Sequence, residues 1–158
     1  MVVVTAFAAL SCKTVPGPVP AIEGEVTQEK VNDALDQIYD TYRSLLIFEG
    51  AQDYTVVAKD TLSDITRRYY GSLTGVGEAG PNNGFYFPLI MMASDSNIVD
   101  PDLIEPGMEL RIVDLEKNLA NPVSRKAIKD SLDGVAYVYN KKGKTATENG
   151  LKKLADSL

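Results

Sequence analysis

Apolar residues recur at helical spacing near the N-terminal end of the chain. The positions that share this face are Val31, Leu35, Ile38, Tyr42 and Leu45. They fall at the 3.6-residue period of an α-helix, which predicts an amphipathic helix with one side in the core. Thr27 is placed to cap its start, and Gly50 stands where we expect the helical segment to stop.

In the middle of the chain, the sequence pattern changes from that of a strand to that of helices and back. Residues 54–57 are β-branched and aromatic and predict a short strand, and a helix follows with Asp60 or Thr61 as its cap and Gly71 at its end. We expect its buried side to carry Leu62, Ile65 and Tyr69. A second helix is predicted from about residue 88 to 94, then a loop over 97–104. Residues 110–113 alternate and predict the closing strand.

A tight turn is predicted just before that strand. Pro106 fixes the first central φ of a type II turn, and Gly107 tolerates the positive φ of the second position.

The C-terminal third is predicted to be helical. Asn121 and Pro122 read as a cap and a first helical residue, and one apolar face follows: Ile128, Leu132, Val135 and Tyr139. Thr145 to Glu148 has the spacing of a capping box and predicts a last helix. We expect residues 27–48 and 121–157 to pack together.

Composition narrows the chemistry of the chain. Its 158 residues include no His, no Trp and a single Cys, which excludes a Ser-His-Asp triad, a Cys-His dyad and a His- or multi-Cys zinc site. Residues 51–116 carry 4 basic and 11 acidic groups, net −7, so nucleic acid is not an expected partner. We expect no cofactor and no metal.

The N-terminal segment resembles the end of a bacterial lipoprotein signal peptide. A short apolar run over residues 2–10 stops at Ser11 and Cys12, and a proline-rich stretch over 13–20 follows. The resemblance implies that Cys12 is acylated. Ala9 stands where the lipobox usually has Leu, and no Lys or Arg precedes the apolar run. The alternative is a buried free Cys in an N-terminal strand.

Several blocks in the middle of the chain resemble a LysM domain in the right order. The blocks are Tyr54-Thr55-Val56, Asp60-Thr61-Leu62-Ser63 with Ile65, Gly71, Leu89-Ile90, Asn97-Ile98, Asp100-Pro101, Ile104, Pro106-Gly107-Met108 and Leu110-Arg111-Ile112. The resemblance covers residues 54–113. It implies an α+β fold: a small βααβ domain with antiparallel strands, here flanked by N- and C-terminal helices that pack beside it.

The resemblance also implies a shallow groove for N-acetylglucosamine-containing glycans between two loops. Its residues would be Lys59, Asp60, Thr61 and Leu62 on one side, and Asn97, Ile98, Val99, Asp100 and Pro101 on the other. Thr61 and Asn97 suit sugar hydroxyls and amides, whereas Leu62 and Ile98 suit the methyl group and ring face. Asp60 and Asn97 also serve as caps or turn residues, so a purely structural role for them stays open.

Two features depart from the family pattern. Lys59 stands where most members have Gly, a residue often used where φ is positive. Residues 72–87 read as an insertion between the helices, with glycines followed by Phe85, Tyr86 and Phe87. We expect these aromatic side chains to pack under the domain, with a lengthened groove as the alternative.

The sequence therefore divides into a signal remnant and tether (1–23), an N-terminal helix (24–50), the LysM domain (51–115) and a helical extension (116–158). We expect a non-catalytic protein of the cell envelope, periplasmic or anchored in the membrane by lipid on Cys12, that binds peptidoglycan or a chito-oligosaccharide-like glycan. The alternative is a LysM scaffold that acts as a protein-interaction adaptor through its terminal helices. A third reading, a glycosidase built on Asp60 and Asp64, is disfavoured because such helical neighbours are usually surface groups.

Overall fold

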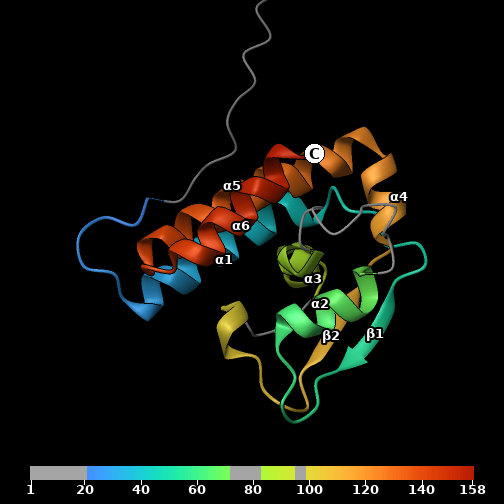
Figure 1. Ribbon diagram of the computed structural model, residues 1–158, viewed down its shortest axis with the longest axis horizontal. Helices are drawn as coiled ribbons and strands as arrows, with labels where there is room; N and C mark the ends of the chain where they lie inside the picture. Colours follow the sequence, from blue (N-terminus) through green and yellow to red (C-terminus); the bar gives the residue numbers. More distant parts are fainter. Residues whose placement is uncertain (1–20, 72–82, 95–98) are drawn as a thin grey trace, which may run out of the picture.

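The computed structural model describes residues 21–71, 83–94 and 99–158, which form an α+β structure (Figure 1). A βααβ core is flanked by an N-terminal helix and by helices that follow the second strand. This confirms the fold class expected from the sequence. The elements in chain order are α1 (Gln28–Arg43), β1 (Gln52–Thr55), α2 (Leu62–Tyr70), the 3₁₀ turn η1 (Asn83–Tyr86), α3 (Phe87–Ala93), the 3₁₀ turn η2 (Pro101–Leu103), β2 (Glu109–Ile112), α4 (Leu115–Ala120), α5 (Pro122–Lys141) and α6 (Thr145–Asp156).

The two strands form an antiparallel pair in which Gln52 faces Ile112 and Thr55 faces Glu109. The pairing begins two residues before the predicted strand, and Val56 extends it with a backbone bond to the carbonyl of Met108 at 2.8 Å. Gly107 has a φ of 92°, which confirms the turn predicted ahead of β2.

Helix α2 begins where the sequence predicted, and its cap is Thr61. The Thr61 hydroxyl accepts the backbone N–H of Asp64 at 3.2 Å, and the helix ends at Tyr70 before Gly71. Its buried side includes Ile65, which is 0% exposed, together with Thr66 and Tyr70. Tyr69 is partly buried: it packs against the core and makes an edge-on ring contact with Tyr54 at 5.7 Å, so it lies at the edge of the predicted buried side.

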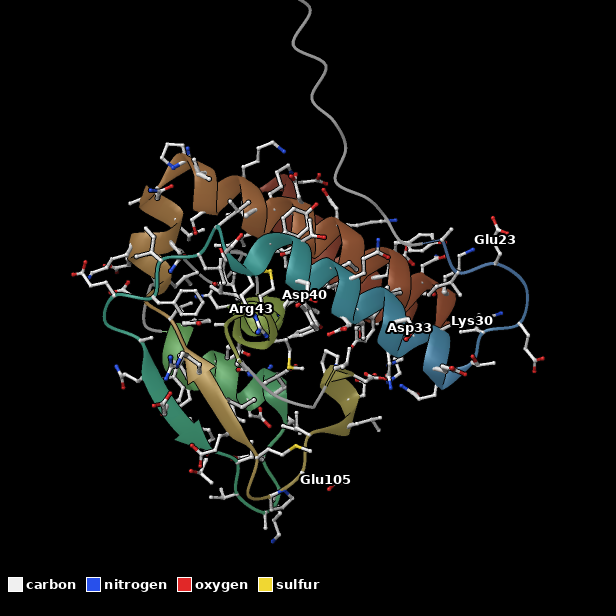
Figure 2. All side chains as sticks on the ribbon, turned by 180° about the vertical axis from the view of Figure 1, so that it is seen from behind. Glu23, Lys30, Asp33, Asp40, Arg43 and Glu105 are labelled. Atoms are coloured by element: carbon white, nitrogen blue, oxygen red, sulfur yellow. The ribbon has the colours of Figure 1, made fainter. Side chains whose placement is uncertain are left out.

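Helix α3 lies at the centre of the molecule. All seven of its residues are buried, because β2 and α2 contact it from one side and α1 and α5 from the other (Figure 1). At its C-terminal end, Arg43 of α1 donates from Nε to the carbonyl of Met92 at 2.9 Å (Figure 2). A cation at this position suits the negative end of the helix.

Helix α1 follows the predicted face but ends earlier than expected. Thr27 caps it, Val31 and Ile38 are among its buried residues, and the last helical residue is Arg43 rather than a residue near Gly50. The chain then turns so that Leu46 enters the core, which leaves Leu45 41% exposed. Gly50 has a φ of 83° in the loop that leads into β1.

The helices after β2 depart from the prediction in two places. Helix α4 was not predicted, because six residues are too few to show a period. Helix α5 begins as expected after Asn121, which caps it. Glu148 does not close a capping box on α6: its carboxylate accepts from Asn140 and Lys152, and Lys144 occupies the cap position.

Helices α5 and α6 form a hairpin that lies beside α1 (Figure 1). Gly134 of α5 lets Ile38 of α1 approach closely, since a β-carbon there would lie 3.1 Å from the Ile38 side chain. The flanking helices and the βααβ core therefore share one continuous set of buried apolar residues.

Candidate functional site

The two loops that were predicted to line the groove border a pocket of about 240 Å³. We call it the loop pocket. It is lined by Asp60, Thr61, Leu62, Ser63, Phe87, Pro101, Asp102, Ile104, Tyr139 and Thr147. The structure thus brings part of the first predicted loop opposite part of the second one. It also adds walls from α3, α5 and α6 that the sequence analysis did not place there.

The first wall begins at a strained backbone position. Lys59 has a φ of 76°, so a Lys occupies the left-handed conformation in which the family usually has Gly. The departure from the family pattern therefore places a residue with a β-carbon at a positive φ. The Lys59 side chain is exposed and does not line the loop pocket.

Asp60 is held by the loop it lies in. Its carboxylate accepts the Tyr54 hydroxyl at 2.5 Å and the backbone N–H of Val57 at 3.0 Å, and Arg68 lies 3.3 Å away. The hydrogen bond from Tyr54, then that from Val57 and the Arg68 guanidinium, hold the pKa of Asp60 below its usual value. The side chain therefore fixes the loop and presents a compensated charge to the loop pocket.

Thr61, Leu62 and Ser63 continue this wall into α2. Thr61 is exposed and uses its hydroxyl to cap the helix, and it also donates to the Asp64 carboxylate at 2.7 Å. Leu62 is buried and gives the pocket an apolar surface. The Ser63 hydroxyl has no hydrogen-bond partner among the residues that the structure describes.

The second wall is built differently from the sequence-based expectation. Asp100 is 2% exposed and does not line the loop pocket, since its carboxylate is occupied within the protein. Both oxygens accept from Lys142 at 2.8 Å, and Gln28 of α1 donates to one of them at 2.8 Å. Asp100 therefore anchors η2, and its role as a sugar contact stays a prediction.

Pro101 does line the loop pocket, as expected, whereas Val99 packs against the core. Asn97 and Ile98, which the prediction also placed here, lie outside the described residues, and so does Cys12. Most of the predicted insertion, residues 72–82, lies outside them as well.

Asp102 is a site residue that the sequence analysis missed. Its carboxylate accepts the Tyr139 hydroxyl at 3.1 Å and the ammonium of Lys144 at 2.8 Å, and it also pairs with Lys142. Burial raises the pKa of Asp102, but the hydrogen bonds and charges of the two lysines outweigh burial and hold that pKa below its usual value.

Tyr139 was predicted correctly as a core residue, but its place beside the loop pocket could not be read from a helical face. Its ring makes an edge-on contact with Phe87 at 5.8 Å, and the ammonium of Lys142 lies 4.9 Å from the ring centre.

The aromatic trio of the predicted insertion, Phe85, Tyr86 and Phe87, packs inward. Tyr86 is buried edge-on against Tyr70, and the Phe85 ring lies where a β-carbon on Gly150 would be. The packing interpretation of this trio is confirmed, with Phe87 also lining the pocket.

Two other hollows of similar size lie along β2. One of about 220 Å³ is next to Tyr70 and Asp114, and one of about 320 Å³ is next to Asp53 and Arg111. Neither is lined by the predicted loops. Among the described residues there is no group of three or more acidic or thiol side chains placed to hold a metal ion.

An antiparallel strand pair joined through two helices, with a polar pocket between two loops, defines a small α+β module. Comparison with known families identifies residues 54–113 as a LysM domain. Domains of this family typically bind peptidoglycan or chitin glycans, which indicates an association with the cell wall or envelope. No curated protein and no solved structure matched the chain.

Proposed function

We propose that this protein is a non-catalytic cell-envelope protein that binds N-acetylglucosamine-containing glycan, such as peptidoglycan, in the loop pocket. The observation that carries the proposal is the pocket itself. It lies between the β1–α2 loop and the η2 loop of a LysM domain, and both carboxylates in its lining are compensated by protein donors.

The lining suits an uncharged sugar. Leu62, Pro101 and Ile104 offer apolar surface to a ring face or an acetyl methyl group. Ser63 offers a hydroxyl that is not used within the described structure. The lining combines these apolar groups with hydroxyls and carboxylates, which matches a sugar ring that has an apolar face and a polar rim. We expect modest affinity, because the contact is small and the sugar hydroxyls lose water on binding.

The carboxylates support binding rather than hydrolysis. A glycosidase needs one carboxylic acid with a raised pKa to protonate the leaving oxygen. Here the pKa of Asp60, Asp64 and Asp102 is in each case below its usual value. For Asp64 the causes are the Thr61 hydroxyl and then the Arg67 guanidinium, which bonds it directly. All three would be ionised at neutral pH.

We further propose that lipid on Cys12 anchors the protein to a membrane. The support is the apolar run that ends at Cys12 and the proline-rich stretch behind it. Within the described residues no helix is long and apolar enough to cross a bilayer. Cys12→Ser in cells should move the protein from the membrane to the soluble fraction and abolish labelling by a fatty-acid analogue. An unchanged membrane fraction would contradict the anchor.

Glycan binding is tested by cosedimentation of the full chain, carrying Cys12→Ser, with purified peptidoglycan. The informative variant is Ser63→Glu, which puts a bulky charge into the loop pocket. Ser63 is the second residue of α2, where an acidic side chain suits the helix dipole, so the fold should tolerate the change.

Val123→Glu is the matched control. Val123 is the second residue of α5, is 59% exposed, and lies sixteen residues, or roughly 24 Å, along that helix from Tyr139. The wild type and the control should sediment with peptidoglycan, and Ser63→Glu should stay in solution. If the wild type also stays in solution, glycan binding is wrong. The protein is then better described as an adaptor whose terminal helices contact another protein.

A further inference from the structure

We infer that the α5–α6 hairpin is part of the sugar-binding site, and that Thr147 contacts the bound glycan together with Ser63. The inference rests on the proposed function and adds a binding residue from outside the LysM domain. Tyr139 and Thr147 line the loop pocket, yet both lie beyond residue 113, where the family match ends.

The first step in the argument is the state of the Thr147 hydroxyl. Thr147 is partly exposed, lies in the first turns of α6, and has no hydrogen-bond partner for its hydroxyl within the described structure. Its neighbour Glu148 is buried and fully engaged with Asn140 and Lys152. The helix is therefore fixed on one side of Thr147, while Thr147 itself presents an unused polar group to the pocket.

The second step is that two unused hydroxyl groups line the same pocket. Ser63 on α2 and Thr147 on α6 both line it, and each carries a hydroxyl that can donate and accept. A sugar ring offers donors and acceptors around its rim. A ligand bound in the pocket can therefore exchange water for hydrogen bonds to both residues. The pocket of about 240 Å³ exceeds the roughly 30 Å³ share of one water molecule several times, so it has room for more than solvent.

The third step is the rigidity of the wall that carries Thr147. Lys142, 12% exposed, joins the α5–α6 turn to Asp100 and Asp102 of the second loop. The Phe85 ring lies against Gly150, one turn further along α6, and leaves no room for a β-carbon there. These contacts hold α6 to both the η1 and η2 segments. Thr147 is thereby positioned before any ligand arrives, which reduces the ordering cost of binding.

The test is a titration of the full chain, carrying Cys12→Ser, with the tetramer of N-acetylglucosamine, followed by calorimetry and by amide NMR shifts. Thr147→Val keeps the shape of the side chain and removes the hydroxyl. We expect it to weaken binding about 2- to 13-fold, the range of one neutral hydrogen bond. Thr145→Val is the matched control: an exposed Thr on the same helix that does not line the pocket, and it should bind as the wild type does.

A second variant, Thr147→Arg, narrows the pocket with a long side chain on the helix surface and should weaken binding further than Thr147→Val. In the wild type, sugar should shift the amides of Ser63 and Thr147 together. The inference is overturned if Ser63→Glu abolishes binding while both Thr147 variants bind as the wild type does. If the wild type binds no sugar at all, the proposed function and the inference fail together.

Discussion

Replacement of Lys59 by Gly should stabilise the protein. Lys59 has a φ of 76°, and its side chain is exposed and makes no hydrogen bond, ion pair or ring contact within the described structure. A non-glycine residue in the left-handed region costs about 1–2 kcal/mol, because its β-carbon crowds the following carbonyl. Glycine removes this cost, but it has more backbone freedom in the unfolded chain, and that offsets about 0.5–1 kcal/mol of the gain. The net gain in the free energy of unfolding should be about 0.5–1 kcal/mol.

The assay is urea unfolding of the full chain, followed by circular dichroism, with Lys59→Ala as the control. Alanine removes the charge and the long side chain but keeps the β-carbon, so it should leave stability near that of the wild type. A gain of this size corresponds to a rise in melting temperature of roughly 1–4 °C for a chain of this length. If the Gly and Ala variants unfold at the same urea concentration, backbone strain at Lys59 is not the cause and the reasoning is refuted.

Two further predictions concern stability. Ile65→Ala should lower the free energy of unfolding by roughly 2–5 kcal/mol in urea titration, because Ile65 is fully buried; a loss below about 0.5 kcal/mol would contradict that burial. Lys142→Met leaves Asp100 buried without its cation and should cost about 3–5 kcal/mol by the same measurement, whereas adding Asp100→Leu should recover much of the loss. A loss for the double variant as large as for Lys142→Met alone would show that the ion pair is not the source.

The local features of the fold could be predicted from the sequence. Thr27, Thr61 and Asn121 cap helices as expected, because a cap depends on a few consecutive residues. Gly107 takes the positive φ that its turn requires, and the Gly expected at position 59 is replaced by a residue that adopts the same φ. These predictions depend on backbone geometry over four or five residues.

The features that sequence reasoning missed depend on contacts between distant segments. Asp100 looked like a loop residue available to a ligand, but a lysine forty-two positions later neutralises it. Thr147 sits in a segment predicted only as a helix. Nothing in its neighbours indicates that α6 packs beside a loop of the LysM domain. Helix α1 ends at Arg43, and that side chain bonds to the last turn of α3, a partner that the local pattern does not reveal.

The central place of α3 makes its burial depend on helices that are synthesised at different times. Its seven residues are covered on one side by α1, which is synthesised before it, and by α5, which is synthesised after it. Residues 54–113 alone would leave that side of α3 in water, and Asp100 would have no Lys142. We therefore expect the core to stay incomplete until α5 has left the ribosome. We also expect residues 54–113 alone to be less stable than the same residues in the full chain.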